Sequence, residues 1–471
     1  MSHPLRRLLA RFRRGLEGMF FFLVLPIFFL RHLLQRNASP DFWKRWRRYL
    51  LDGLGEFRRA WWLLLQMEPV STVLRYLLLI EWRLTTNSPA QVGVSSPGSG
   101  EWKNRPDLRM LVVTPGHLGD VLQMVPAMTA LRKGKPHAHI TWLVGPWSEG
   151  LARRYPVADQ VMAVVPALSQ YQRAAGDQKP TVWDEYRWSQ QVGPGRYDVL
   201  ITTTTTDPWV LYLSVCIQPT AWIGMLPGWD RYRDCAEDVM LAYEPDVYEA
   251  ESLLRIPKIL DCHGTPALIY KVQEAERMEA RRVLEENGLK TGRPFLALAP
   301  GSGWMGKNWP VDRFFEVCSI LSSRYHMPIV ILGAPEERDL ASQIGAGKTE
   351  CPHLINLCGK TSLWVSVAIL AEASMLLGND SGLLHFAAAL GVPTVALFGP
   401  TRPAKWAPRG DRHRALRAVD GCPCISWHPR AQCSQDHACM KAIRVDTVVE
   451  VIEDQLNRRY HEDILFSPSS R

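Results

Sequence analysis

The residues best suited to chemistry lie where apolar segments end in polar turns. In the C-terminal half an apolar segment runs into Asn-Asp-Ser-Gly at residues 379–382, and apolar residues at helical spacing follow. The N–H groups of a helix's first turn and the helix dipole bind anions, and glycine lets a phosphate approach the backbone. We therefore expect Asp380 or Ser381 to cap a helix whose start, with Gly382 and His385, holds a phosphate. The alternative is an ordinary N-cap with a core-facing histidine.

A glycine-rich turn follows another apolar segment, at residues 301–303. Lys307 comes shortly after it and is expected to neutralise the charge of a leaving diphosphate. No Ser or Thr follows this lysine, so the segment departs from the phosphate-binding loop of NTP-hydrolysing enzymes. A surface lysine on a loop is the alternative. Trp309-Pro310 then predicts the start of a helix, with proline at the first helical position.

The third candidate is Asp120, in the run His-Leu-Gly-Asp after the first apolar segment of the α/β part. A carboxylate at the carboxyl edge of a sheet can act as a general base that takes the proton of an acceptor hydroxyl. The alternative is an N-cap for the helix that we predict from about Val121. The two roles are compatible.

Four cysteines lie close together, at Cys422, Cys424, Cys433 and Cys439. Such a cluster is a candidate site for structural zinc or iron. Its Cys-x-Cys spacing differs from the Cys-x-x-Cys of standard zinc sites, so two disulfides or free thiols are alternatives. We expect catalysis itself to need no metal or cofactor, because a lysine and helix N–H groups can supply the positive charge.

Two successive α/β patterns must position these residues. Short apolar segments alternate with helical patterns over residues 108–275 and again over 276–455, which predicts parallel sheets with right-handed crossovers. Ligands of such sheets bind at the carboxyl ends of the strands. We therefore expect an α/β fold of two Rossmann-like domains facing a cleft. The expected strands are 109–113, 140–144, 161–165, 197–201 and 221–225 in the first half, and 295–299, 328–333, 355–359, 375–378 and 394–399 in the second.

The N-terminal residues 1–90 have a different composition. Residues 1–60 hold 13 Lys and Arg against 4 Asp and Glu, whereas the rest of the chain is almost neutral, with 42 against 43. This pattern indicates a local basic segment and argues against a nucleic-acid-binding domain. We expect residues 91–107 to be a linker and 456–471 a tail.

Within the basic segment, residues 19–30 are apolar and contain Pro26, and Trp, Leu and Arg then alternate at helical spacing. The apolar run is short for a spanning helix, and the Trp/Arg pattern is typical of helices lying in the headgroups of an anionic membrane. No signal peptide is evident. We therefore expect a helical membrane-associated segment at the cytoplasmic face of the inner membrane, peripheral or monotopic. A helical subdomain, an oligomer contact or a single span are the alternatives.

The α/β part resembles the bacterial heptosyltransferases of glycosyltransferase family 9, which have the GT-B fold. The resemblance covers roughly residues 108–455, and many members have a similar cysteine tail. The long basic N-terminus departs from the small heptosyltransferases, which begin directly at the first strand. The motifs that carry the resemblance are Gly119-Asp120-Val121-Leu122 with Pro126-Ala127-Met128, Ala299-Pro300-Gly301-Ser302 with Lys307-Asn308-Trp309-Pro310, Gly333-Ala334-Pro335-Glu336-Glu337, and Asn379-Asp380-Ser381-Gly382-Leu383-Leu384-His385 with Phe398-Gly399-Pro400-Thr401.

Carried over by position, the resemblance implies a role for each matching residue. Asp120 would be the base, Ser302 and Lys307 would contact phosphates, and Glu337 would hold the ribose. The remaining donor-site assignments are Gly119, Gly303, Asp380, Ser381, Gly382 and His385.

The resemblance also implies an inverting transferase, with a nucleotide-sugar donor and a lipid-linked glycan acceptor. A heptose moved from ADP-heptose onto lipopolysaccharide is the leading expectation, and another nucleotide-sugar is the alternative. A non-catalytic nucleotide-sugar-binding scaffold of the envelope is a rival that the pairing of Asp120 with Lys307 disfavours. An NAD-dependent oxidoreductase would need Gly-x-Gly-x-x-Gly after the first strand, and residues 114–120 lack it.

Overall fold

The computed structural model describes most of the chain after residue 100. The described residues are 101–164, 192, 195–203, 210, 213, 217, 219–226, 239–345, 351–419, 433 and 436–465. The expected membrane segment at 1–90 lies outside them, so its structure and its membrane contact stay predictions. Among the described residues, no helix is long and apolar enough to cross a membrane.

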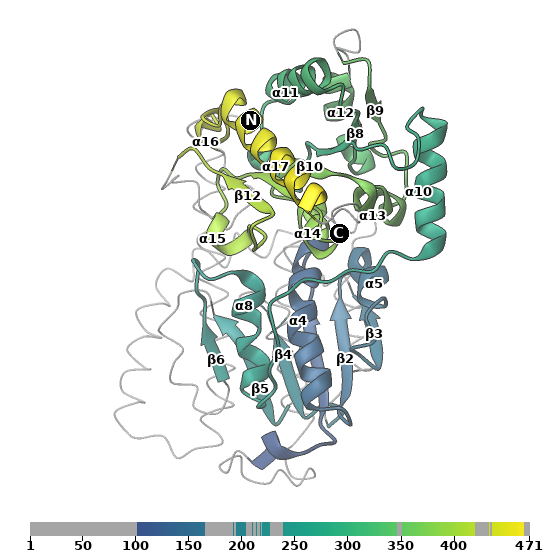
Figure 1. Cartoon of the computed structure of the whole chain (residues 1–471). Helices are drawn as coiled ribbons and strands as arrows, with labels where there is room; N and C mark the ends of the chain where they lie inside the picture. Colours follow the sequence, from purple (N-terminus) through teal and green to yellow (C-terminus); the bar gives the residue numbers. More distant parts are fainter. Residues whose placement is uncertain are drawn as a thin grey trace, which may run out of the picture. The chain divides into compact units, whose positions relative to one another are not determined.

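The first sheet has six strands in the order β3-β2-β1-β4-β5-β6. The pairings β1–β2, β2–β3 and β5–β6 are parallel. The central strands are apolar and buried, as expected for a parallel sheet that helices cover on both faces. In Figure 1 helices α4 and α8 lie over this sheet. The strands are β1 (Arg109–Thr114), β2 (His139–Val144), β3 (Gln160–Ala163), β4 (Val199–Thr202), β5 (Ala221–Leu226) and β6 (Val239–Ala242).

The second sheet repeats this arrangement in the order β12-β11-β10-β7-β8-β9, with all its pairings parallel. Two parallel Rossmann-like sheets are therefore confirmed. The cleft that we expect them to face stays a prediction. The strands are β7 (Leu296–Ala299), β8 (Ile329–Ile331), β9 (Leu354–Asn356), β10 (Met375–Asn379), β11 (Thr394–Leu397) and β12 (His413–Leu416).

Each sheet has one strand more than the sequence predicted. The segment 221–225 is not the last strand of the first sheet, because β6 pairs beyond it. In the second sheet β12 pairs with β11 at the edge. Its sequence His-Arg-Ala-Leu is half polar, and an edge strand tolerates such residues because one of its sides lacks a partner strand. The apolar pattern that marks buried strands therefore missed it.

The helices that connect the strands also refine two predictions. Helix α4 begins at Leu118, earlier than the predicted Val121. Pro310 is the N-cap of α11 and not its first residue, since its backbone is still extended at φ −56° and ψ 138°. The longer helices are α4 (Leu118–Gly134), α5 (Pro146–Ala152), α10 (Glu274–Glu286), α11 (Val311–Tyr325), α12 (Arg338–Gly345), α13 (Leu363–Glu372), α14 (Gly382–Ala389) and α17 (Val445–Leu465). The short helices are α8 (Glu249–Leu253), α9 (Arg255–Lys258), α15 (Pro403–Trp406) and α16 (Ala438–Lys441), with the 3-10 turns η2 (Glu101–Asn104), η5 (Met305–Lys307) and η6 (Pro335–Glu337).

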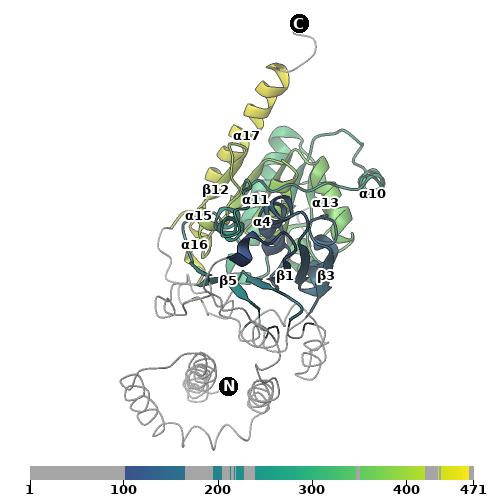
Figure 2. The ribbon, with the colours of Figure 1, turned by 90° about the horizontal axis from the view of Figure 1, so that it is seen from below.

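Helix α17 closes the second sheet on the side of α11. Its buried residues Val448, Val449 and Ile452 join the core with Phe314 and Leu321 of α11. The C-terminal end of α17 extends beyond the other helices of this sheet (Figure 2).

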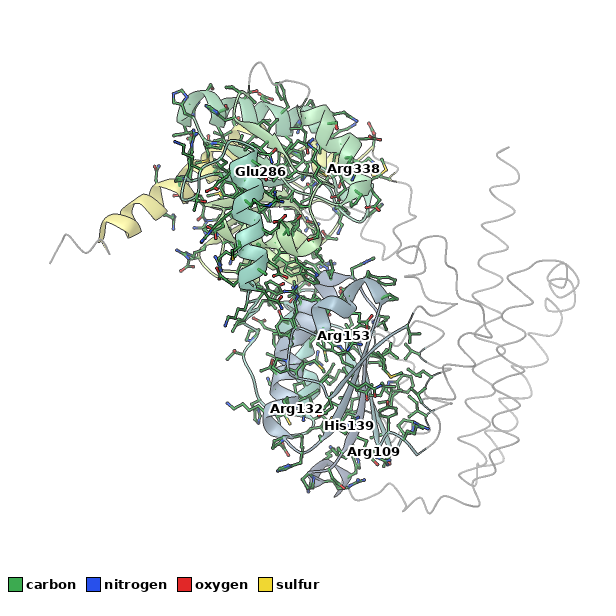
Figure 3. The ribbon with its side chains drawn as sticks, turned by 90° about the vertical axis from the view of Figure 1, so that its right-hand side faces the viewer. Arg109, Arg132, His139, Arg153, Glu286 and Arg338 are labelled. Carbon is green, nitrogen blue, oxygen red and sulfur yellow. The ribbon has the colours of Figure 1, made fainter. Side chains whose placement is uncertain are left out.

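The amino edge of the first sheet is held by an ion cluster. Arg132 of α4 lies 2.5 Å from a carboxylate oxygen of Asp159, which also accepts the backbone N–H of Ile140 at 2.7 Å. Arg109 and His139, the first residues of β1 and β2, are found at this edge (Figure 3). The candidate residue Asp120 follows β1 and therefore lies at the opposite, carboxyl edge of this sheet.

Candidate functional site

Two helices begin beside each other at the candidate site. Residues 99–164, 201–204 and 223–471 form one compact unit, which contains both of these helices. A Cβ atom built on Gly382, the first residue of α14, would lie 3.9 Å from the Cβ of Leu118, the first residue of α4. Each helix start carries unpaired N–H groups and a partial positive charge. Their meeting point is therefore well suited to a polyanion such as a diphosphate.

Ser381 is the N-cap of α14, which settles the choice between Asp380 and Ser381. Its backbone is extended at φ −147° and ψ 173°, and its side chain makes no capping hydrogen bond. The buried Ser381 hydroxyl finds no hydrogen-bond partner among the described residues. A buried polar group normally has a partner, so this hydroxyl is available to a ligand at the start of α14.

Asn379 holds the end of β10 in place. Its wholly buried amide donates from Nδ2 to the carbonyl of Pro300 at 2.6 Å, and its Oδ1 accepts the backbone N–H of Trp309 at 3.2 Å. Trp309 is itself buried and donates from its indole to the carbonyl of Ile443 at 3.1 Å. Both ends of the glycine-rich turn are thereby fixed to the strand that leads into α14.

Lys307 and Asp380 form an ion pair at this site. The Lys307 Nζ lies 3.2 Å from the Asp380 Oδ2, and both side chains are largely buried. Burial alone would raise the pKa of the Asp380 carboxyl, but Lys307, His385 and the Thr401 hydroxyl outweigh it and lower that pKa. Asp380 is therefore ionised at neutral pH, and the lysine is held close to the helix start.

His385 lies one turn into α14 and is buried, with 5% of its surface exposed. Its Nδ1 is 3.2 Å from the side-chain nitrogen of Gln123, a wholly buried residue of α4. Burial lowers the pKa of His385 more than Asp380 and Asp120 raise it. The imidazole is therefore neutral at pH 7. The alternative of a core-facing histidine is correct in that His385 is buried. The ring is nevertheless close enough to Asp380, Asp120 and Lys307 for their charges to act on it.

Gly119 leaves the space that His385 occupies. A Cβ atom built on Gly119 would lie 2.7 Å from the His385 Cδ2 and 3.3 Å from its Nε2. Contacts under 3.0 Å are sterically excluded, so a larger residue would displace the imidazole. Gly119 thus permits the two helices to pack closely.

Asp120 is the third residue of α4, with His117 as the N-cap. Its Oδ2 accepts the backbone N–H of His117 at 2.7 Å, as in one half of a capping box. The alternative that Asp120 is itself the N-cap is therefore wrong in position, although the residue does stabilise the helix start. Its charge acts on His385 and on Glu249, which places it among the other charged groups of the site.

Ser302 organises the glycine-rich turn. Its hydroxyl lies 2.7 Å from the carbonyl of Trp304 and 2.6 Å from the Asn308 Oδ1. Gly303 is exposed, and a Cβ atom there would meet nothing within 4 Å. Ser302 therefore shapes the turn that delivers Lys307, whereas its predicted phosphate contact stays a prediction.

Glu337 lies at the carboxyl ends of the adjacent strands β7 and β8. Its Oε2 accepts the backbone N–H of Ala334 at 2.8 Å. A Cβ atom on Gly301 would lie 2.0 Å from the Glu337 Oε1, and one on Gly333 would lie 2.6 Å from Oε2. Burial raises the pKa of this carboxyl, with a further contribution from Glu336. The absence of side chains at Gly301 and Gly333 thus makes room for a partly desolvated carboxylate. Such a carboxylate is suited to accepting hydrogen bonds from sugar hydroxyl groups.

The cysteine cluster is described only in part. Cys422 and Cys424 lie outside the described residues, whereas Cys433 is half-buried and Cys439 is buried. Among the described residues, no group of three or more His, Cys, Asp or Glu is arranged to hold a metal ion. The structural zinc or iron site stays a prediction.

Three features of the site were not foreseen from the sequence. Gln123 reads as an ordinary helical residue, and Asn379 reads as part of a turn; their partners are distant in sequence. The third is the buried Lys405, which lies 2.5 Å from the Glu249 Oε2 and 3.2 Å from the Ser252 hydroxyl. Only 1% of the Lys405 surface is exposed, and a buried lysine needs a carboxylate partner. No local sequence pattern predicts that Glu249 is this partner.

Comparison with known proteins identifies this arrangement. Residues 244–433 match the model of glycosyltransferase family 9 (heptosyltransferase). This part of the chain is therefore similar to glycosyltransferase family 9. The matched region contains Lys307, Glu337, Asp380 and His385.

Curated relatives match a longer part of the chain than the family model does. The chain is 25% identical over 329 residues to lipooligosaccharide heptosyltransferase 2 of Haemophilus ducreyi, which covers 67% of this chain and 90% of the relative. Solved structures confirm the GT-B-like fold. A family 9 glycosyltransferase of Veillonella parvula superposes with a TM-score of 0.60 at 21% identity, covering 74% of this chain and 98% of its own. An E. coli ADP-heptose LPS heptosyltransferase II superposes with a TM-score of 0.56 at 20% identity, covering 75% and 100%.

Proposed function

We propose that this family 9 glycosyltransferase moves a heptose from ADP-heptose onto a lipid-linked envelope glycan, with inversion at the anomeric carbon. The observation that supports it most is the meeting of Lys307, Asp380 and His385 where α4 and α14 begin. This site offers the Lys307 ammonium, the N–H groups at the start of α14 and the Ser381 hydroxyl to a nucleoside diphosphate. Two of the proteins named above are described as heptosyltransferases, and the description of the E. coli protein names ADP-heptose.

The proposed reaction is a single in-line displacement. The Asp120 carboxylate takes the proton of an acceptor hydroxyl, whose oxygen forms a bond to the anomeric carbon. The bond from that carbon to the phosphate oxygen breaks, and ADP leaves with the electron pair. Asp120 already uses Oδ2 for the N–H of His117, so we assign Oδ1 to the acceptor hydroxyl.

The departing diphosphate needs positive charge in place before the bond breaks. Lys307 and the N–H groups at the start of α14 provide it, and the Ser381 hydroxyl and His385 add hydrogen-bond donors. The proposal requires no metal ion for this step. Glu337 is assigned to the ribose hydroxyls, because it lies beside Gly301 on the same edge of the second sheet.

The full-length protein tests the proposal directly. ADP-heptose, UDP-glucose and UDP-N-acetylglucosamine should each be incubated with it and with a truncated lipopolysaccharide acceptor. We expect transfer and release of ADP only from ADP-heptose, with an inverted anomeric centre in the product. Transfer from a UDP-sugar would contradict the donor assignment. Tight binding of ADP-heptose without any turnover would instead favour a non-catalytic scaffold.

We also propose that the protein acts at the cytoplasmic face of the inner membrane, as a peripheral or monotopic protein. The support is the basic, Trp-rich composition of residues 1–90. Deletion of residues 1–66 should move the protein from the membrane pellet to the soluble fraction. Retention in the pellet would contradict the assignment of this segment as the anchor.

A further inference from the structure

The contact between Gln123 and His385 joins two helices that belong to different sheets. Gln123 is on α4 and His385 is on α14, and 262 positions separate them in the sequence. Both side chains are buried, and their polar atoms are 3.2 Å apart. An amide buried against an imidazole is a costly arrangement unless the hydrogen bond is made, so this contact constrains the ring.

The chemistry of the contact sets the position of the ring proton. In the orientation that the structure gives the Gln123 amide, its nitrogen faces the His385 Nδ1. An amide nitrogen can only donate, so Nδ1 accepts in this orientation. A neutral imidazole that accepts at Nδ1 carries its proton at Nε2. The charged groups acting on the ring are Asp380, Asp120 and Lys307, and burial keeps the ring neutral among them.

The opposite side of the ring points towards the proposed diphosphate site. Gly119, the second residue of α4, is the neighbour of the Nε2–Cδ2 edge, since a Cβ atom there would lie 3.3 Å from Nε2. That edge therefore faces the place where α4 and α14 begin. A proton on Nε2 is a hydrogen-bond donor to an anion held there, whereas a bare Nε2 would repel the anion.

We propose that Gln123 is a positioning residue, whose amide holds His385 in the Nε2–H tautomer and directs that N–H at the diphosphate. The identity of the ligand rests on the proposed function, whereas the tautomer does not. Asp120 lies one turn earlier on the same helix. Helix α4 thus carries Asp120, the proposed base. Through Gln123 it also fixes the His385 N–H that would donate a hydrogen bond to the leaving diphosphate.

The tautomer can be observed in the full-length protein without any ligand. Histidine labelled with ¹⁵N on the ring distinguishes a protonated from an unprotonated nitrogen by NMR, and the His385→Gln variant assigns the signal. We expect a protonated Nε2 and an unprotonated Nδ1 in the wild type. In Gln123→Glu the carboxylate should draw a proton onto Nδ1. A wild-type ring with its proton on Nδ1 would overturn the proposal, because the amide would then be accepting.

Binding of ADP gives a second readout. In Gln123→Met, which conserves the volume but removes the amide, we expect the affinity for ADP to fall about tenfold, as for loss of one hydrogen bond to a charged group. Gln455→Met is the matched control, since Gln455 is a buried glutamine of α17, and its affinity should not change. An unchanged affinity in a folded Gln123→Met variant would overturn the role in binding. Failure of the wild type to bind ADP would count against the proposed donor instead, and the NMR result would stand.

Discussion

The Lys307 ammonium lies 3.2 Å from the Asp380 carboxylate, at the start of a helix whose N–H groups also attract anions. The carboxylate keeps the lysine extended into the site, but it also places a negative charge beside a diphosphate. Lys307 must therefore offset Asp380 as well as the ligand. Substitutions of Lys307 and of Asp380 should therefore change the affinity for a diphosphate to different extents.

Substitution of Lys307 should weaken donor binding more than substitution of Asp380. In Lys307→Met the affinity for ADP should fall by about 30-fold or more, because a buried charge loses its partner beside the phosphates. Asp380→Asn removes that charge and should have a smaller effect. The double variant should bind ADP better than Lys307→Met does, as isothermal titration calorimetry can measure. Additive losses in the double variant would show that the two residues do not act as a pair.

Asp120→Asn tests the base without disturbing the helix start. The asparagine oxygen can still accept the N–H of His117, so α4 should keep its cap. We expect kcat to fall by about 10² to 10⁴, the usual contribution of a general base. The affinity for ADP should stay within about twofold. Wild-type kcat in Asp120→Asn would exclude this residue as the base.

The positions of the strands could largely be predicted from the sequence, since buried parallel strands are short apolar runs between polar turns. Prediction missed the two edge strands β6 and β12, and at β12 the edge position permits His413 and Arg414 in a strand. The sequence also singled out the charged groups that the structure brings together at the starts of α4 and α14, because they follow strand ends. The partners of those groups were not. Gln123 and His385 meet only because α4 and α14 pack together, and nothing local in the sequence encodes that packing.

Glu337→Gln should distinguish ribose recognition from phosphate recognition. The amide retains an acceptor for the N–H of Ala334 but loses the charge that attracts sugar hydroxyl groups. We expect the affinity for ADP to fall by about tenfold, as for one charge-assisted hydrogen bond, while the affinity for pyrophosphate is unchanged. Equal losses for both ligands would place Glu337 at the phosphates.

Gly119→Ala should displace His385, since the new methyl group would lie 2.7 Å from the ring. Overpacking of this kind costs about 1 to 3 kcal/mol in stability, and we expect kcat/KM to fall by about tenfold or more. Gly345→Ala is the matched control, because a Cβ atom there meets nothing within 4 Å and alanine favours helix α12. Full activity of Gly119→Ala would show that His385 can move without loss of function.

His413 predicts how stability depends on pH. Burial, together with Arg412 and Arg414, lowers its pKa to about 4, whereas an unfolded histidine titrates near 6.5. The unfolded state therefore binds a proton first as the pH falls. The contribution to stability is complete above about pH 6.5 and is lost towards pH 4, with a total on the order of 3 kcal/mol. Urea unfolding at pH 7 and pH 4.5 should show a smaller pH effect in His413→Gln, and an equal effect would refute this origin.

Asn379 has a consequence for how substrates enter and products leave. Its amide ties the carbonyl of Pro300 and the N–H of Trp309 to the end of β10. The two ends of the turn therefore cannot swing open as a hinged lid, since both hydrogen bonds would have to break in the protein interior. Exchange of nucleotide at this turn would therefore require movement of its middle residues while both of its ends stay fixed. Strand β10 would keep the same position whether or not nucleotide is bound.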